Sequence, residues 1–271
     1  RINYQLLDAR VIEDPYPFYR ALLSDAPVYQ VPGTEVYLVS SWQLIHEVLK
    51  NQTDYSANLT GILISDERGQ PELFDLSQFG GSGDAIANAD EPFHAVHRKL
   101  VLPQLNARKV VAMEGEVRSW ARAGVLQLLA SGGGDCVGDL ANAIPVKVMA
   151  RLMGLPVGDV TQLLRAYLAR HFDSVFHSIG DREPQSVMAE LANGVREGVI
   201  SKDEAIAISI VLVGAAGEST SSLVGSAIRI LAENTELQRQ LREQPALIER
   251  YVEEVVRLES PFKGHYRAVL K

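Results

Sequence analysis

The sequence predicts a mainly α-helical protein with a small β element near its N-terminus. Two short runs of β-forming residues lie before residue 40, and helical spacing of apolar residues dominates after Glu91. The chain shows no alternation of strands with helices, which argues against a Rossmann-type fold or a barrel. We expect one domain over residues 1–271.

The bulk composition narrows the class of protein. The 271 residues are 46% hydrophobic and 22% charged, which suits a globular protein with a large core. The formal net charge of −8, with scattered acidic residues, argues against a nucleic-acid partner, because phosphate binding requires a basic stripe. The longest strongly apolar stretch, Ile206–Gly217, is too short to span a bilayer, and no basic-then-apolar leader opens the chain. We expect a soluble, cytoplasmic protein with no membrane span.

The N-terminal elements follow from turn and strand signals. Asp14-Pro15-Tyr16-Pro17 leads into a helix, and Pro32-Gly33-Thr34 joins two runs of β-forming residues into a hairpin. The expected elements are a helix at Phe18–Ser24, strands at Val28–Val31 and Val36–Val39, a helix at Trp42–Lys50, and a long polar loop from Asn58 to Asp90. Loops of that length tend to be functional or mobile.

The remainder of the chain reads as helical. Gly132-Gly133-Gly134 ends one helix, and Pro261 follows a closing helix pair. The expected helices are Arg108–Ser131, a core helix Val137–Met153 that tolerates Pro145, the longest run Ala207–Ala232, and the pair Leu237–Glu243 and Leu247–Glu259.

The longest helix has an unusual centre. Ser201 and Glu204 have the spacing of a capping box that starts it, and the following apolar residues cover every face, as in a buried helix. From Gly214 to Ser222 the residues become small or hydroxylated; each glycine costs about 1 kcal/mol against alanine, and Ser or Thr can bond back to carbonyls four residues earlier. Two interpretations stay open: close packing against a neighbouring helix, or a groove where a ligand approaches the backbone.

Two residue pairs carry further weight. Glu254 and Arg257 lie three apart on one helix, opposite an expected apolar side, which by itself predicts a surface ion pair worth about 0.2–0.5 kcal/mol. That apolar side consists of Ile248, Val252, Val255 and Val256. His94 and Arg98 lie four apart and share a face, which suits an anionic ligand but also occurs on solvated helices. His94 and His97 lack a third ligand at a sensible spacing, so we expect no metal site there.

Four segments occur in an order that matches one known family. They are Asp90–Arg98 with its His-x-x-x-Arg spacing, Ala216–Ser221 in the long helix, the Glu-x-x-Arg of Glu254–Arg257, and Arg267 after Ser260-Pro261. Together with the opening segment Asp14–Ser56, they resemble the cytochrome P-450 family, especially its soluble bacterial members. The Glu-x-x-Arg spacing alone carries little weight, whereas the four matches in register cover nearly the whole chain.

The resemblance implies a haem-dependent monooxygenase that inserts one oxygen atom from O2 into a small hydrophobic substrate. The cofactor would be haem b (heme b, iron protoporphyrin IX), held by a cysteine thiolate that favours O–O cleavage. Ferredoxin and ferredoxin reductase would supply electrons as separate partners, because no reductase domain is visible. A haem-free, non-catalytic helical protein of the same fold that binds small molecules is the alternative, and an unrelated helical scaffold would make every match a coincidence.

The resemblance also implies roles for particular residues. His94, Arg98 and Arg267 would pair with the haem propionates through charge-assisted hydrogen bonds. Ala216 and Gly217 would line the oxygen groove. Thr220 would relay protons, with the protein supplying substrate placement and proton delivery. Glu254 and Arg257 would lock the proximal side of the haem pocket to a later segment.

The sequence departs from the family pattern at the proton relay. Ser219 stands where an acidic residue ordinarily precedes the threonine, and Glu218 lies one residue earlier, about 100° round the helix. Either Glu218 substitutes through water or proton delivery is rearranged. Our hypothesis is that Thr220 keeps its role and that Ser219 contributes a hydroxyl.

Two further departures concern length. The region between Leu164 and Arg182 is shorter than the two helices and loop that the family places over the substrate, either because part of the lid is lost or because residues are missing from the sequence; we favour the second.

The chain stops at Lys271, before the family's cysteine loop. Cys136 lacks that loop's aromatic, glycine and basic neighbours, and reads as a small buried cysteine. We therefore expect the N-terminal two-thirds of such a domain, a fragment or an incompletely observed whole that cannot ligate haem in the family's way. The substrate class stays open among steroids, fatty acids, terpenes and peptides.

Overall fold

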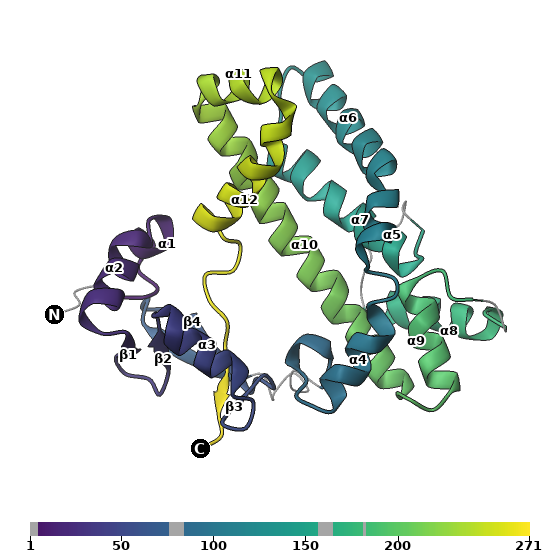
Figure 1. Ribbon diagram of the computed structural model, residues 1–271, viewed down its shortest axis with the longest axis horizontal. Helices are drawn as coiled ribbons and strands as arrows, with labels where there is room; N and C mark the ends of the chain where they lie inside the picture. The colour runs from purple at the N-terminus through teal and green to yellow at the C-terminus, as the bar shows by residue number, and fades with distance from the viewer. Residues whose placement is uncertain (1–4, 76–83, 157–164, 181–182) are drawn as a thin grey trace. The chain divides into compact units, whose positions relative to one another are not determined.

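A computed structural model describes residues 5–75, 84–156, 165–180 and 183–271, and the chain forms two compact units (Figure 1). Unit 1 comprises residues 1–94 and 266–271, and unit 2 comprises residues 95–265. The chain is mostly helical with a few short strands, so the predicted fold class is confirmed. That the whole chain belongs to one domain stays a prediction.

Unit 1 holds the β element and the first helices. The expected helix–hairpin–helix order at its start is confirmed: α3 begins at Trp42 because the Ser41 hydroxyl accepts the Leu44 N–H, and Phe18 and Leu22 of α2 are buried with Val11. The elements are α1 (Ala9–Glu13), α2 (Tyr16–Asp25), α3 (Trp42–Lys50) and the antiparallel pairs β1 (Val28–Gln30) with β2 (Tyr37–Val39), β3 (Tyr55–Ser56) with β6 (Ala268–Val269), and β4 (Gly61–Ser65) with β5 (Pro71–Asp75).

The prediction of a polar loop throughout Asn58–Asp90 is wrong. The β4–β5 hairpin occupies much of it, and a 3-10 turn at Ile86–Asn88 follows. The turn that joins β4 to β5 forms because the Asp66 carboxylate accepts the N–H groups of Arg68 and Gln70 at 2.8 and 2.7 Å. Gly69 in this turn adopts a φ of 77°. The run of Ile and Leu in β4 was the available strand signal, and the polar residues around it concealed it.

Unit 2 is a helical assembly around α10. Its helices are α4 (Phe93–Val101, which starts at the end of unit 1), α5 (Ala107–Ala112), α6 (Glu114–Ala130), a π-helical turn at Val137–Ala141, α7 (Ala143–Met153), α8 (Arg165–Ser178), α9 (Val187–Arg196), α10 (Lys202–Glu233), α11 (Thr235–Glu243), a 3-10 turn at Pro245–Leu247, and α12 (Ile248–Leu258). The predicted helix pair near the C-terminus is thereby confirmed.

The 32 residues of α10 form the centre of unit 2. The capping box is present: the Ser201 hydroxyl accepts the Glu204 N–H, and the Glu204 carboxylate accepts the Ser201 N–H. Figure 1 shows α7 beside α10, with α8 and α9 at its N-terminal end and α11 and α12 at its C-terminal end. Its N-terminal half is the more buried, through residues such as Ala205, Ile206 and Ile208.

Two predicted helices are interrupted. Arg108–Ser131 divides at Met113, which caps α5 and starts α6. Val137–Met153 opens with the π-helical turn, in which the Asn142 N–H bonds to the Val137 carbonyl five residues earlier at 2.9 Å. Pro145 is tolerated because it lies in the first turn of α7, where a helix has no internal partner for its N–H groups.

The apolar side expected for α12 is also partly wrong. Val255 is buried, but Ile248, Val252 and Val256 are exposed. The side of α12 that faces the rest of the unit instead carries Tyr251, Val255 and Leu258. With Leu247 just before the helix, and with Ile230, Leu237 and Leu241, these residues line a hollow of about 510 Å³. The Tyr251 hydroxyl donates to the Ala227 carbonyl at 2.5 Å and joins α12 to α10.

By length and composition, α10 could cross a membrane, unlike the shorter apolar stretch considered from the sequence. One such helix is weak evidence and does not show membrane insertion; in the described structure α10 packs against α7, α8 and α9.

The short region between Leu164 and Arg182 contains α8, whose Leu168 and Phe172 are buried. Both ends of that region, at residues 157–164 and 181–182, lie outside the described residues.

The end of α7 provides a test of the fold. Gly154 has a φ of 79°, and a Cβ at this position would lie 2.7 Å from Ser186, which caps α9. We expect Gly154→Ala to lower the free energy of unfolding by about 1–3 kcal/mol, because alanine disfavours this conformation and would collide with Ser186. Chemical denaturation measures the change. Gly115→Ala is the control, since the space around Gly115 in α6 is open and alanine favours helix; equal losses in both variants would contradict the prediction.

Candidate functional site

The start of α4 is fixed by Asp90. Its carboxylate accepts the Ala57 N–H at 2.8 Å and the Ser56 hydroxyl, and its carbonyl accepts the His94 N–H at 3.0 Å. Asp90 therefore joins the β3 segment to the first turn of α4. Nothing in the sequence motif pointed to this role, because Ser56 and Asp90 are 34 residues apart.

His94 and Arg98 lie one helical turn apart on α4, as predicted. The His94 Nδ1 is 3.0 Å from Oε1 of Glu91, its side chain is 34% exposed, and Arg98 is exposed. Both side chains are thus accessible to a ligand, and their N–H donors suit a carboxylate.

His97 lies about 60° around α4 from His94 and about 100° from Arg98, and it is fully buried. Its Nε2 is 3.5 Å from Oε1 of Glu204, at the start of α10. From the sequence, His97 was weighed only as a metal ligand beside His94; among the described residues no group of three His, Cys, Asp or Glu side chains is placed to hold a metal ion. The signal that was missed is the helical period, which puts His97 on one face with the buried Val101.

The centre of α10 is continuous helix despite its glycines. The Ser219 hydroxyl donates to the Ala215 carbonyl at 2.6 Å, and the Ser221 hydroxyl donates to the Gly217 carbonyl at 2.7 Å. The predicted back-bonding to carbonyls four residues earlier is therefore confirmed for these two serines.

The predicted site residues of α10 lie near an accessible surface. Thr220 and Glu218 are exposed, and Ala216, Gly217 and Ser219 are half-buried. A Cβ on Gly214 or Gly217 would meet no atom within 4 Å, whereas one on Gly225 would contact Val137 at 3.4 Å. The backbone around Gly214 and Gly217 can therefore be approached closely by another group.

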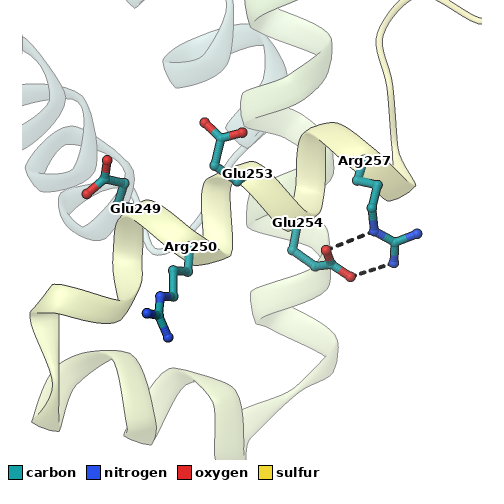
Figure 2. A pocket seen from close by; sticks show the side chains of 5 residues that line it. All are labelled: Glu249, Arg250, Glu253, Glu254 and Arg257. Atoms are coloured by element: carbon teal, nitrogen blue, oxygen red, sulfur yellow. Dashed lines mark hydrogen bonds and ion pairs between the residues drawn. The ribbon is translucent and has the colours of Figure 1, made fainter.

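Glu254 and Arg257 form a two-point ion pair on α12, with Nε to Oε2 at 2.9 Å and Nη2 to Oε1 at 2.5 Å (Figure 2). Both side chains are more than half exposed, so the surface pair expected from spacing is confirmed. The hydrogen bonds from Arg257 lower the pKa of Glu254 and keep it ionised. Glu249, Arg250 and Glu253, which precede the pair on α12, line the same open hollow of about 630 Å³ (Figure 2).

Arg267 and Cys136 complete the predicted set. Arg267 immediately precedes β6 in unit 1, is half-buried, and donates from Nη1 to the Tyr266 carbonyl at 2.8 Å. Cys136 is half-buried at the start of the π-helical turn and forms no disulfide. The candidate residues thus lie on α4, α10 and α12 and at the start of β6.

Comparison with known proteins gives a consistent result. No family model matches the chain. Cytochrome P-450 144 of Mycobacterium tuberculosis is 31% identical over 290 residues, which cover 96% of this chain and 66% of that protein. Cytochrome P-450 130 of the same species is 26% identical, covering 99% of this chain and 72% of that protein. The match with cytochrome P-450 144 is longer than the chain itself, so that relative carries internal residues that this chain lacks.

Solved structures share the fold. The substrate-free cytochrome P-450 CYP150A6 of Mycobacterium marinum matches with a TM-score of 0.81 and 23% identity, over 97% of this chain and 69% of that one. CYP108D1 of Novosphingobium aromaticivorans matches with a TM-score of 0.80 and 21% identity, over 95% and 69%.

The fold is therefore the mainly helical one of these cytochrome P-450 structures. The chain belongs to the cytochrome P-450 family, and it spans about two thirds of the length of the curated relatives it matches.

The role of Asp90 can be tested by substitution. We expect Asp90→Ala to lower the free energy of unfolding by about 1.5–3 kcal/mol, because it removes a carboxylate that accepts bonds from Ser56 and Ala57. Thermal unfolding measures this. Asp84→Ala is the matched control, since exposed Asp84 accepts a bond from the Asn58 side chain; a loss at Asp84 as large as that at Asp90 would refute the assignment.

Proposed function

We propose that the protein is a haem-dependent monooxygenase that inserts one oxygen atom from O2 into a small hydrophobic substrate. The observation that carries the proposal is the centre of α10. There the structure combines accessible backbone at Gly214 and Gly217 with the exposed hydroxyl-bearing residue Thr220, on a helix that is otherwise apolar. Membership of the cytochrome P-450 family supports the same reaction class.

We assign three side chains with N–H donors to the haem propionates. His94 and Arg98 supply N–H donors from adjacent turns of α4, and we assign Arg267 to the same function. When bound, haem b supplies the activation of dioxygen and the electron transfer that amino-acid side chains cannot provide. Ala216 and Gly217 leave room for dioxygen beside α10. We assign no ligand role to Cys136, because it lies within helical structure between Asp135 and Asp139.

Proton delivery is assigned to Thr220. Ser219 directs its proton to the Ala215 carbonyl, so its oxygen is left as an acceptor for a neighbouring water or hydroxyl. Glu218 is exposed and lies two positions, about 200°, from Thr220 around the helix, so it would act through water. We propose that the Thr220 hydroxyl delivers the proton and that the Ser219 oxygen orients the group that donates to it. Glu218 exchanges protons with the solvent.

The Glu254–Arg257 pair is assigned a structural role. Its two hydrogen bonds hold the guanidinium in a fixed orientation on the outer side of α12. We assign the pair the function that the family resemblance implies, which is to lock the proximal side of the haem pocket to a later segment.

Charge distribution supports an electron-transfer partner. Between residues 98 and 122 the chain carries six basic and two acidic residues, although its net charge is −8. Exposed cations of α4 to α6, including Lys99, Arg108 and Arg122, would attract an acidic ferredoxin and speed its association. Ferredoxin and ferredoxin reductase are accordingly the proposed partners, and the cytoplasm is the proposed location.

Haem binding by the full-length protein tests the proposal. The reduced carbon monoxide complex is expected to show the strongly red-shifted Soret band of thiolate-ligated haem. Arg98→Ala should accelerate transfer of haem to an apo-globin acceptor about tenfold, because a charge-assisted bond contributes about 1.5–3 kcal/mol. Arg108→Ala, which removes a nearby exposed arginine, should leave the rate unchanged. A purified protein that never takes up haem would instead be the non-catalytic binding protein.

The proton relay has its own test. Thr220→Ala is expected to reduce product formed per electron consumed by tenfold or more while substrate still binds, because proton delivery by a positioned group contributes about 10²–10⁴-fold. Product and peroxide are measured against reductant consumed. Ser222→Ala removes an exposed hydroxyl two residues further along α10, about 200° around the helix from Thr220, and serves as the control. Equal coupling in wild type and Thr220→Ala would sink the assignment.

A further inference from the structure

Two serines flank Thr220 on α10, and each donates its hydroxyl to a carbonyl one turn earlier. The Ser219 hydroxyl bonds to the Ala215 carbonyl at 2.6 Å. The Ser221 hydroxyl bonds to the Gly217 carbonyl at 2.7 Å. Thr220, which is exposed, therefore stands between two hydroxyls whose protons the helix backbone already accepts.

The Ser221 hydroxyl is held in its bond by burial. Ser221 is 7% exposed. On the same side of α10 one turn later, a Cβ at Gly225 would contact Val137 of the π-helical turn at 3.4 Å. A buried hydroxyl without a partner is unfavourable, so we expect the bond to the Gly217 carbonyl to be made persistently.

Ser221 lies where the exposed part of this side of α10 ends. Gly214 and Glu218 lie within about 60° of Ser221 around the helix, and both are exposed. A Cβ on Gly217 would meet no atom within 4 Å, so the space beside this residue is open. Solvent can therefore approach the backbone at Gly217 from the exposed turn.

The Gly217 carbonyl uses both of its acceptor positions within the helix. Every backbone carbonyl can accept two hydrogen bonds. The N–H four residues later takes one position in a continuous α-helix, and the Ser221 hydroxyl takes the other. Without that hydroxyl, the second position would be left to water, because carbonyls on the solvent side of a helix turn toward water.

We infer that Ser221 is a positioning residue that keeps water off the Gly217 carbonyl, so that protons reach the centre of α10 through Thr220. The inference rests on the proposed function, in which Thr220 delivers the proton. Ser221 itself touches neither substrate nor cofactor. It acts by closing the acceptor that lies nearest to the open space in this turn of the helix.

The consequence concerns the fate of electrons. A water bound at Gly217 would give protons a second route that bypasses Thr220. Dioxygen, two electrons from the reductant and two protons would then leave as hydrogen peroxide. Loss of the Ser221 hydroxyl is therefore expected to increase peroxide formation.

Another serine of α10 makes the same bond in a closed environment. Ser209 is 1% exposed and donates to the Ala205 carbonyl at 2.9 Å. Ala205 is 0% exposed, so solvent does not reach its carbonyl when the hydroxyl is removed. Ser209→Ala is therefore the matched control, because it removes one buried bond of the same kind from the same helix.

Crystal structures of the full-length wild type, Ser221→Ala and Ser209→Ala test the inference without reference to activity. We expect an ordered water within about 2.7–3.2 Å of the Gly217 carbonyl oxygen in Ser221→Ala alone. A water at that carbonyl in the wild type, or none there in Ser221→Ala, would overturn the inference. Alanine favours helix at both positions, so both variants are expected to fold.

Peroxide formation gives the functional measurement. The substrate-free full-length protein receives electrons from NADPH through ferredoxin reductase and a saturating [2Fe–2S] ferredoxin. Ser221→Ala is expected to form peroxide about two- to tenfold faster than the wild type, the ratio that the free energy of one hydrogen bond implies. Ser209→Ala should match the wild type.

The outcomes separate the inference from the proposed function. Equal peroxide rates in Ser221→Ala and wild type, or equal increases in both variants, would contradict a positioning role for Ser221 and leave the proposed function standing. If the protein takes up no haem, the proposed function fails, whereas the crystal structures still decide whether Ser221 keeps water off the Gly217 carbonyl.

Discussion

The capping box at Ser201 and Glu204 fixes where α10 begins, and much of unit 2 depends on that register. Because the helix starts at Lys202, Ala205, Ile206 and Ile208 fall among the buried residues of the unit. A shift of the sequence by one residue along the helix axis would turn every side chain of α10 by about 100°. The same register places the small residues from Gly214 to Ser222 at mid-helix, and it leaves one oxygen of Glu204 facing α4.

The centre of α10 persists because its two ends are secured. Gly214 and Gly217 each weaken a helix by about 1 kcal/mol relative to alanine, and the serines share carbonyls that the helix backbone also uses. Packing against α7, α8 and α9 stabilises one end, and the Tyr251 bond to Ala227 joins the other end to α12. A segment of low intrinsic stability can thus remain helical and still present open backbone, which is what a groove for a small ligand requires.

Sequence reasoning succeeded where local chemistry decides the structure. The cap at Ser41, the capping box at Ser201 and the helical periods fix helix starts through contacts within a few residues. It failed where the environment decides. The β4 strand has five residues, too few for periodicity to outweigh the glycines and aspartates around it. The inner side of α12 depends on how that helix meets α10 and α11, so counting apolar residues alone placed Val252 and Val256 on it incorrectly.

The same division applies to the candidate site. Pairs at i,i+3 or i,i+4, such as Glu254 with Arg257, follow from helix geometry alone, and the structure shows that ion pair. The approach of His97 to Glu204 depends instead on how α4 packs against α10, which no local pattern specifies. Motif spacing predicts which side of α4 faces a ligand, whereas the buried side next to it, which carries His97, meets the start of α10. In a protein whose proposed chemistry needs cofactor and proton donor in fixed relation, the buried side of a ligand-binding helix is as much part of the site as its exposed side.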